Sequence, residues 1–357
     1  MGLIPQRDYF DKDIANSDNT SGYYIIEHND FVYNPRKSSD APYGPISRYA
    51  YPDAGIVSPL YLCFRANGGV DTNFFEWYFR SSVWHRYIYM TGDSGARHDR
   101  VSIKDDDFFS MPIRFPSATE QKKIAAFLNI VERRITSQQL LVDNLKKYKR
   151  GLISEVLKQK LVLSREGEKW EKVSLSDVAD GFEYGMNAAA TSFDGEHKYI
   201  RITDIDDDAH TYIASDPVSP SGVLEEKYRV RENDILFART GASVGKSYLY
   251  RKTDGDLFFA GFLIRIHIKE GVDSGYVFLN TLTEDYDKWV LLESARSGQP
   301  GINAEQYKRY SFKLPPLKIQ KQISGIAQKM DEQIKREYLC LRLLQKQRDG
   351  ILQQLFI

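Results

Sequence analysis

The sequence predicts an α+β protein in which two related globular domains are separated by two long packed helices. Three observations predict this class. A long segment near the middle of the chain recurs at its end with the same spacing of apolar residues. The stretches before the two copies also resemble each other. Both stretches are rich in Tyr, Phe, Val and Ile in short runs broken by Gly, Asp and Asn, which is typical of short strands and turns.

The long segments correspond without a gap. Residues 116–157 return as residues 315–356, and polar residues interrupt both copies at the same places, Gln138 with Glu337 and Lys149 with Arg348. Apolar residues recur at steps of three and four, which predicts helices. The residues expected to pack are Ile124, Val131, Ile135, Leu145 and Leu152 in the first copy and Ile323, Met330, Ile334, Leu344 and Ile351 in the second. The same stripes include Phe127, Val142 and Val156, and Ile326, Leu341 and Leu355.

Two arrangements of these helices are open. Each helix could pack only on its own domain, or the two could pack on each other as an antiparallel, coiled-coil-like pair. Matched length, matched interruptions and few helix breakers favour the second arrangement. At about 1.5 Å per residue, each helix would be roughly 58 Å long and would act as a spacer in an internal pseudo-twofold repeat.

The domains before the helices are related more loosely. Residues 29–34 match residues 233–238, Ser94-Gly95 matches Ser297-Gly298, and residues 74–89 and 276–293 are predicted to be helical. The stretch 170–205 has no counterpart before the first domain, so we expect the front part of that domain to be missing from a truncated or split chain. The predicted divisions are a first domain at 1–116, a first helix at 117–160, a second domain at 161–316 and a second helix at 317–357.

Composition narrows the class of protein. The chain has 357 residues, 42% of them hydrophobic, with 49 basic and 49 acidic side chains and a formal net charge of +0. No apolar run approaches the roughly 18 residues of a membrane span, and the N-terminus lacks the features of a signal peptide. The only two cysteines, Cys63 and Cys340, lie far apart, which predicts neither a disulfide nor a zinc site. We expect a cytoplasmic protein that does not contact a membrane.

The segments that resemble catalytic motifs depart from them in spacing or in residue type. The run Gly241–Ser247 has three residues between its glycines where a nucleotide-binding loop needs four. The run Asn34–Lys37 places Arg36 and Lys37 where an adenine methyltransferase needs proline and an aromatic ring. The six histidines are scattered without metal-ligand spacing. The sequence therefore predicts no cofactor, no metal and no catalytic site.

Several segments resemble specificity subunits of type I restriction–modification systems. They are Trp170–Val178, Asn233–Gly241 and the helix start at Leu314, with counterparts at 30–35 and 107–112 in the first domain. The resemblance covers nearly the whole chain, and it rests on the repeated order rather than on one motif. It implies two target-recognition domains that each read half of a bipartite site in double-stranded DNA. It also implies two methyltransferase (M) subunits docked on the helices, with restriction (R) subunits joining them.

Polar residues on turns are the candidates for DNA contact. Arg can pair with guanine and Gln or Asn with adenine, while Lys and Ser suit phosphates. In the second domain the candidates are Arg239, Thr240, Ser243, Lys246, Ser247, Arg296, Ser297, Gln299 and Asn303. In the first domain they are Asn34, Arg36, Lys37, Ser38, Arg97, His98 and Arg100.

Other functions remain as alternatives. A coiled-coil adaptor would use the domains to bind protein, and a standalone DNA-modifying enzyme would need the donor or metal site that the motifs do not supply. Zero net charge is unusual for a protein that binds DNA alone, because phosphate contacts need basic residues. We therefore expect partners to supply some phosphate contacts, and a partner fragment or a second copy to complete the first domain.

Overall fold

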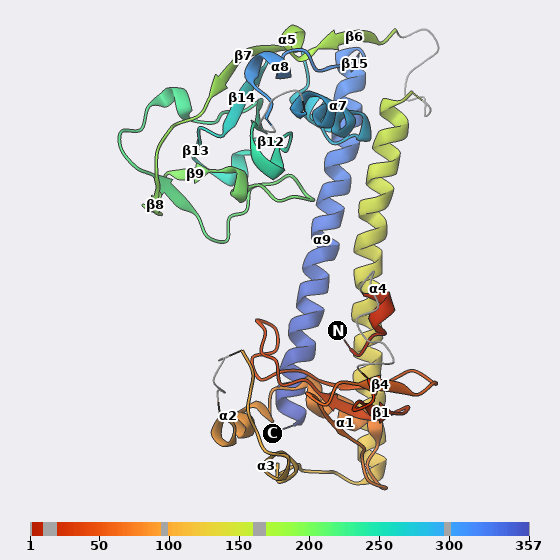
Figure 1. The fold of residues 1–357 in the computed structure, drawn as a ribbon. Coiled ribbons are helices and arrows are strands. Elements are labelled where there is room, and N and C mark those ends of the chain that lie inside the picture. Colours follow the sequence, from red (N-terminus) through yellow and green to blue (C-terminus); the bar gives the residue numbers. More distant parts are fainter. Residues whose placement is uncertain (1, 10–19, 94–98, 160–168, 296–300, 357) are drawn as a thin grey trace. The chain divides into compact units, whose positions relative to one another are not determined.

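A computed structural model of the chain describes residues 2–9, 20–93, 99–159, 169–295 and 301–356 (Figure 1). The chain forms two compact units. Unit 1 comprises residues 1–142 and 336–357, and unit 2 comprises residues 143–335. Each unit contains one strand-rich domain and parts of both long helices. The boundaries between the two units therefore fall within the long helices. The domain limits expected from the sequence remain a prediction.

The two long helices are α4 (Ala118–Leu157) and α9 (Leu317–Leu355), which run side by side in opposite directions (Figure 1). Their central contact joins the first pair of matched interruptions. Gln138 Nε2 donates to the carbonyl of Glu337 at 3.0 Å and to its carboxylate at 2.7 Å. The antiparallel pair predicted from the repeat is confirmed. The interruption of both apolar stripes at this position is explained by a polar contact between the two interrupting residues.

The second pair of interruptions forms two ion pairs that mirror each other. In unit 2, Lys149 Nζ lies 2.5 Å from Asp331 Oδ1. In unit 1, an Arg348 guanidinium nitrogen lies 3.1 Å from Glu132 Oε2. Lys149 corresponds to Arg348 in the repeat, and Glu132 corresponds to Asp331. The same contact is therefore made twice, with the roles of the two helices exchanged, as in an isologous interface.

Most of the predicted stripe faces inward. The ten residues expected to pack between the helices are all buried or half-buried. Phe127, Ile326 and Leu355, however, are 49%, 37% and 41% exposed. Ala125 and Leu128 are buried instead. Residues two apart on a helix point in widely different directions. Phe127, Ile326 and Leu355 therefore do not belong to the buried face of their helices.

Unit 1 is built around β2 (Phe31–Tyr33), whose three side chains are all buried. β2 lies between β3 (Ile46–Arg48) and β5 (Leu62–Phe64) in an antiparallel sheet, and β1 (Tyr24–Ile26) pairs with β4 (Gly55–Val57). The helices of its domain are α1 (Thr72–Arg80), α2 (His85–Thr91), α3 (Asp105–Phe109) and a short 3₁₀ turn, η1 (Gln6–Asp8).

Unit 2 is built around β11 (Asp234–Ala238), which is fully buried in a sheet of order β12-β11-β14-β7. Smaller sheets join β10 to β8, β13 to β9 and β15 to β6. The strands are β6 (Glu171–Ser174), β7 (Ala179–Tyr184), β8 (Ala190–Ser192), β9 (Lys198–Ile200), β10 (Val218–Pro220), β12 (Ser247–Leu249), β13 (Leu257–Phe259), β14 (Leu263–Ile268) and β15 (Ser311–Leu314). The α-helices are α5 (Leu175–Val178), α6 (Ser274–Asn280), α7 (Glu284–Ser294) and α8 (Ala304–Tyr307), and the 3₁₀ turns are η2 (Ile202–Asp204), η3 (Glu226–Tyr228), η4 (Gly241–Ser243) and η5 (Lys252–Asp254).

The two domains share the arrangement around the central strand. Tyr33 of β2 stacks on Phe108 with ring centroids 5.2 Å apart, and Phe237 of β11 contacts Tyr307 at 4.7 Å. The residues before both strands, Asn29 and Asn233, adopt left-handed backbone conformations with φ of 74° and 70°. Asparagine tolerates this region better than most residues, so the repeated Asn-Asp pair begins the same turn in both domains.

The helices expected at 74–89 and 276–293 are each broken into two, α1 with α2 and α6 with α7. At the breaks, the Ser81 hydroxyl donates to the carbonyl three residues earlier at 2.6 Å, and that of Thr281 does the same at 2.7 Å. Hydroxyl side chains that bond to nearby carbonyls compete with the helix, and both breaks occur where such a bond forms.

Unit 2 has a segment without a counterpart in the described part of unit 1. In unit 2, β7 covers the outer edge of β14, and Ile264 and Ile266 of β14 are 0% exposed. In the described residues of unit 1, no strand pairs with the outer edge of β5. The corresponding residues Leu62 and Phe64 are only half-buried. The absence of a front segment from the first domain remains a prediction.

In unit 1, α1 is joined to both long helices by an apolar cluster formed by Phe74, Trp77, Ala125, Leu128 and Leu352. The buried residues of this cluster differ from those of the core around β2, and Phe356 packs against both. The indole Nε1 of Trp77 donates to the Asn129 side chain at 2.9 Å. The domain and the helices of unit 1 are therefore held by a small separate core.

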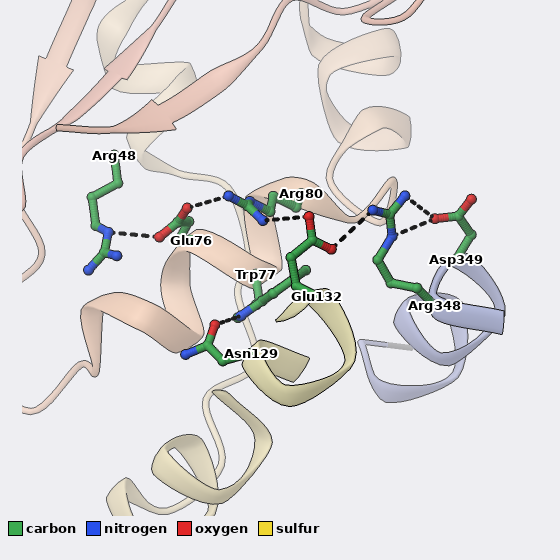
Figure 2. Close-up of polar contacts among 8 residues, drawn as sticks. All are labelled: Arg48, Glu76, Trp77, Arg80, Asn129, Glu132, Arg348 and Asp349. Carbon is green, nitrogen blue, oxygen red and sulfur yellow. Dashed lines mark hydrogen bonds and ion pairs between the residues drawn. The ribbon is translucent and has the colours of Figure 1, made fainter. Parts of the chain in front are cut away.

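A chain of charges runs beside this cluster (Figure 2). Glu76 lies between Arg48 and Arg80, with both ion pairs at 2.8 Å, and Arg80 reaches Glu132 at 3.8 Å. Glu132 then binds Arg348 of α9. Several of these side chains line a shallow hollow of about 480 Å³. The polar network thus connects β3, α1, α4 and α9 within unit 1.

In unit 2 the same joint is apolar. Phe278 and Leu279 of α6, which correspond to Glu76 and Trp77 in the repeat, are 7% and 4% exposed. They belong to one cluster that includes Ile153 of α4, Ala327 of α9 and the core of the domain. The helices of unit 2 therefore share one hydrophobic core with the domain, while a second core of the domain, which includes Leu236 and Tyr248, contains no residue of the helices.

Candidate nucleic-acid interface

The candidate loops of each unit meet through the same backbone hydrogen bond. In unit 1 the Val101 amide donates to the Pro35 carbonyl at 2.9 Å. In unit 2 the Ile302 amide donates to the Arg239 carbonyl, also at 2.9 Å. The two turns that the sequence analysis treated as separate clusters are thus brought together after the central strand of each domain.

Arg239 of unit 2 is distinguished by two aromatic rings that contact its guanidinium group. Its guanidinium carbon lies 5.0 Å from the ring centroid of Tyr184 and 6.0 Å from that of Phe262. These rings are 43% and 61% exposed. Within the described residues the Arg239 side chain makes no hydrogen bond or ion pair, and its Nε is buried without an acceptor. Cation–π contact holds the group in place, and its terminal nitrogens make no hydrogen bond within the described residues.

Several other arginines of unit 2 are paired with acidic side chains. Arg201 pairs with Asp204 at 2.8 Å, and Arg229 pairs with Asp256 at 3.0 Å. Such pairs satisfy the donors that a base or phosphate would need. Arg239 differs from them by contacting rings in place of a carboxylate.

The glycine-rich turn after Arg239 uses its amides internally. Gly245 donates to the Ala238 carbonyl at 2.9 Å, and Lys246 donates to the Ser243 carbonyl at 3.0 Å. Gly245 has φ +89°, and a Cβ there would lie 2.6 Å from Val290 of α7. The turn therefore requires glycine for close packing, and these amides are not free to cradle a phosphate.

The side chains of two candidates, Lys246 and Ser247, bind to other groups of unit 2. Lys246 Nζ forms an ion pair with Asp207 and donates to the Ile205 carbonyl at 3.1 Å. The hydrogen bond and charge of Lys246 hold the pKa of Asp207 below its usual value. Ser247 is 0% exposed, and its hydroxyl oxygen lies 2.7 Å from that of Thr281. Ser247 begins β12 and Lys246 precedes it, and contact of either residue with phosphate remains a prediction.

The remaining candidates of unit 2 have mixed positions. Thr240 and Ser243 are half-buried, and Thr240 is bridged to Gly301. Asn303 is exposed, but its side-chain oxygen caps α8 by accepting from the Gln306 amide at 2.9 Å. Arg296, Ser297 and Gln299 lie outside the described residues.

In unit 1 the candidates form a basic surface. The Asn34 side chain accepts from the Arg36 amide at 3.0 Å and shapes the turn. Arg36 lies opposite Arg100 in a β-bridge, and both are exposed. Within the described residues, the side chains of Arg36, Lys37 and Arg100 make no hydrogen bond or ion pair. This cluster is available to an anionic ligand.

The last candidates of unit 1 include Ser38, whose hydroxyl accepts from the Ala41 amide at 3.1 Å and so closes a turn. Arg97 and His98 lie outside the described residues. Sequence analysis missed Tyr184 and Phe262. Their contact with Arg239 depends on the pairing of β7 with β14, which no local pattern reveals.

None of the helices in the described ranges is long and apolar enough to cross a membrane. In those same ranges, no group of three or more His, Cys, Asp and Glu residues is arranged to hold a metal ion.

Residues 167–339 match the family described as the type I restriction modification DNA specificity domain. This part of the chain is similar to the specificity subunits of type I restriction–modification systems. It is 24% identical over 263 residues to the type I restriction enzyme StySPI specificity subunit of Salmonella potsdam, covering 69% of this chain and 56% of that protein. It is 26% identical over 200 residues to the putative MjaX specificity subunit of Methanocaldococcus jannaschii, covering 53% and 46%. The chain spans about half the length of these specificity subunits.

Solved structures of the family share the fold. A chain from a structure that describes complex assembly and conformational transition of the type I R-M system superposes with a TM-score of 0.61 at 17% identity, covering 93% of this chain and 82% of that one. The type I S subunit from M. genitalium gives a TM-score of 0.53 at 13% identity, covering 97% and 87%. The predicted α+β class, with a long helix between two strand-rich regions, is confirmed.

Proposed function

We propose that this chain selects DNA sequences for a methyltransferase and nuclease assembly and is not itself catalytic. The observation that carries the proposal is the duplicated loop junction with unpaired basic side chains, Arg239 in unit 2 and Arg36 and Arg100 in unit 1. Two similar junctions on different domains are what a reader of a bipartite site in double-stranded DNA needs. The similarity to specificity subunits supports the same function.

Arg239 is the leading candidate for reading a base. An arginine can donate two hydrogen bonds to guanine O6 and N7 in the major groove, which discriminates against other bases by about 1–3 kcal/mol. The rings of Tyr184 and Phe262 restrict the guanidinium before DNA arrives. A restricted side chain loses less entropy on binding, so its contact is stronger.

Partners on the long helices would be two M subunits, with R subunits joining them. In unit 1, α4 and α9 carry large apolar side chains that are between 42% and 59% exposed. These are Leu140, Leu141, Tyr338, Leu339 and Leu343. Exposed apolar groups that gather in this way are typical of protein interaction sites, which supports docking of a partner here.

A partner fragment or a second copy would complete the domain of unit 1. Phe109 is 58% exposed. In unit 2 the corresponding Lys308 lies 5.7 Å over the ring of Phe182 in β7. A strand added at β5 would cover Phe109 and the half-buried Phe64 in the same way. Arg36→Ala and Arg97→Ala should then affect recognition only when that strand is supplied.

The experiment compares Arg239→Ala with Arg231→Ala, a matched arginine of unit 2 that is exposed and paired with Glu226. Each chain is assembled with its M and R subunits, and DNA methylation is mapped by sequencing. We expect Arg239→Ala to reduce methylation at the wild-type motif by about 5- to 150-fold, following the discrimination above. Arg231→Ala should leave it unchanged. A wild-type complex without a bipartite motif, or equal effects of both substitutions, would contradict the proposal.

A further inference from the structure

A buried glutamine sits one turn into each long helix and ties it to the adjacent domain. In unit 1, Gln121 is 3% exposed. Its Nε2 donates to the Pro116 carbonyl at 2.9 Å, and its Oε1 accepts from the Asp71 backbone amide at 2.8 Å. Both halves of the amide are therefore used.

Unit 2 repeats the arrangement. Gln320 is 2% exposed. Its Nε2 donates to the Pro315 carbonyl at 2.7 Å, and its Oε1 accepts from the Asp273 amide at 2.9 Å. Gln320 corresponds to Gln121 and Pro315 to Pro116 in the repeat. We call each glutamine with its two bonds an amide clamp.

Each clamp holds the residue that caps a helix of the domain, α1 in unit 1 and α6 in unit 2. The Asp71 side chain accepts from the Phe74 amide at 3.0 Å and caps α1. The Asp273 side chain accepts from the Tyr276 amide at 2.8 Å and caps α6. An amide is planar, so two bonds on opposite sides fix its neighbours in direction as well as distance. The clamp therefore sets the angle between α1 and α4 in unit 1, and between α6 and α9 in unit 2.

Both units have the amide clamp, although the contacts around it differ between the units. Beside the clamp, unit 1 has ion pairs of Glu76 and Arg80, while unit 2 has the apolar Phe278 and Leu279. Two joints with different chemistry thus keep the same two hydrogen bonds. A requirement for the angle itself explains this better than a requirement for stability, which either chemistry could meet.

We propose that Gln121 and Gln320 are positioning residues that set the angle of each DNA-reading domain on its long helix, and with it the spacing between half-sites that the complex accepts. This rests on the proposed reading of a bipartite site. A tilt of about 10° moves a loop that lies roughly 20 Å from the joint, a typical domain radius, by about 3.5 Å. Successive base pairs are separated by about 3.4 Å, so a small tilt is enough to favour a different spacing.

The test uses the full chain assembled with its M and R subunits, carrying Gln320→Met or Gln121→Met. Methionine has a similar size but forms neither bond. Gln322→Met is the matched control, since Gln322 is exposed on the same helix. Methylation is mapped across the genome, and binding is measured on duplexes whose spacer is one base pair shorter, unchanged or longer. We expect the clamp variants to raise the ratio of altered to normal spacing at least tenfold, and the control to leave it unchanged.

The ratio separates positioning from stability. A purely structural role lowers methylation and binding at every spacing alike, and an unchanged ratio in both clamp variants overturns the proposal. If a methionine variant does not fold, Gln320→Glu, which keeps an acceptor for the Asp273 amide, is measured on the same duplexes and must shift the ratio in the same direction. A bipartite wild-type motif with unshifted variants refutes only the clamp. A wild-type complex without such a motif refutes the proposed function, and the clamp proposal with it.

Discussion

The two joints between domain and helices are built from equivalent positions but opposite chemistry. In unit 1 a chain of ion pairs from Arg48 to Arg348 lies beside a small apolar cluster, separate from the domain core. In unit 2 the joint and the domain share one hydrophobic core. A partly exposed ion pair contributes little stability and is weakened by salt, whereas buried apolar groups contribute more and do so cooperatively.

This difference decides whether a domain can detach from its long helices and remain folded. The domain of unit 2 should not leave its helices without exposing the core that lies between them, because Ile153 and Ala327 of the helices belong to that core. The domain of unit 1 has its own core around β2 and can loosen at the joint while remaining folded. Three experiments test the comparison.

The largest effects are expected from truncating one buried residue in each joint. Ile153 and Leu352 correspond in the repeat and are 6% and 5% exposed. Replacement of either by Ala should cost about 2–5 kcal/mol. Hydrogen exchange should distinguish them. Ile153→Ala should increase exchange throughout the sheet of unit 2, while Leu352→Ala should increase it in α1 and the end of α9 but not in β2. If hydrogen exchange increased throughout the domain in both variants, the two joints would not differ in the way described.

A smaller effect is expected from Glu76→Gln. The substitution keeps the size of the side chain but leaves Arg48 and Arg80 next to each other without the carboxylate between them. We expect a loss of about 1–2 kcal/mol at low salt, less at 0.5 M salt because screening reduces the repulsion. Urea unfolding at two salt concentrations measures this loss. Glu305→Gln, at an exposed pair with Lys308, is the control and should change nothing measurable. A loss independent of salt would contradict the ionic description.

The smallest effect is expected from Lys149→Met. Lys149 and Arg348 occupy equivalent positions, but the acid that Lys149 contacts, Asp331, is 41% exposed. Arg348 is linked through Glu132 to the network of unit 1. We expect Lys149→Met to cost at most about 0.5 kcal/mol and Arg348→Met about 1 kcal/mol. If urea unfolding showed a larger loss of stability for Lys149→Met than for Arg348→Met, the ion pairs of Glu76 and Arg80 would add nothing to the pair of Arg348 with Glu132.

The long helices could be predicted because their pattern is local and repeated. A gapless repeat with matched interruptions is enough to align Gln138 with Glu337 by residue type and spacing alone. The helix breaks near Ser81 and Thr281 were not predicted, because the spacing of apolar residues gives no information on whether a hydroxyl side chain bonds to the nearby backbone. Helix periodicity also could not tell Phe127 from Ala125, since the partner surface decides which of them fits.

The sequence places the candidate residues on loops but does not reveal what surrounds each side chain. The sequence places the loops after the central strands, and the structure joins them by one repeated hydrogen bond. The availability of a side chain, however, depends on distant partners. Asp207 neutralises Lys246, Thr281 buries Ser247, and Tyr184 supports Arg239. None of these three partners is adjacent in sequence, so residue type and turn position were insufficient.

The contact between Gln138 and Glu337 has a consequence for self-association. The two residues occupy the same position of the repeat, yet one is neutral and the other acidic. If the second helices of two molecules paired with each other in the same register, Glu337 would face Glu337, and two carboxylates would be buried together without a donor. Such a like-charge contact disfavours the homodimeric pairing, whereas the intramolecular pair gives each group a partner. One unlike pair at the centre of a duplicated helix therefore directs the chain to fold back on itself.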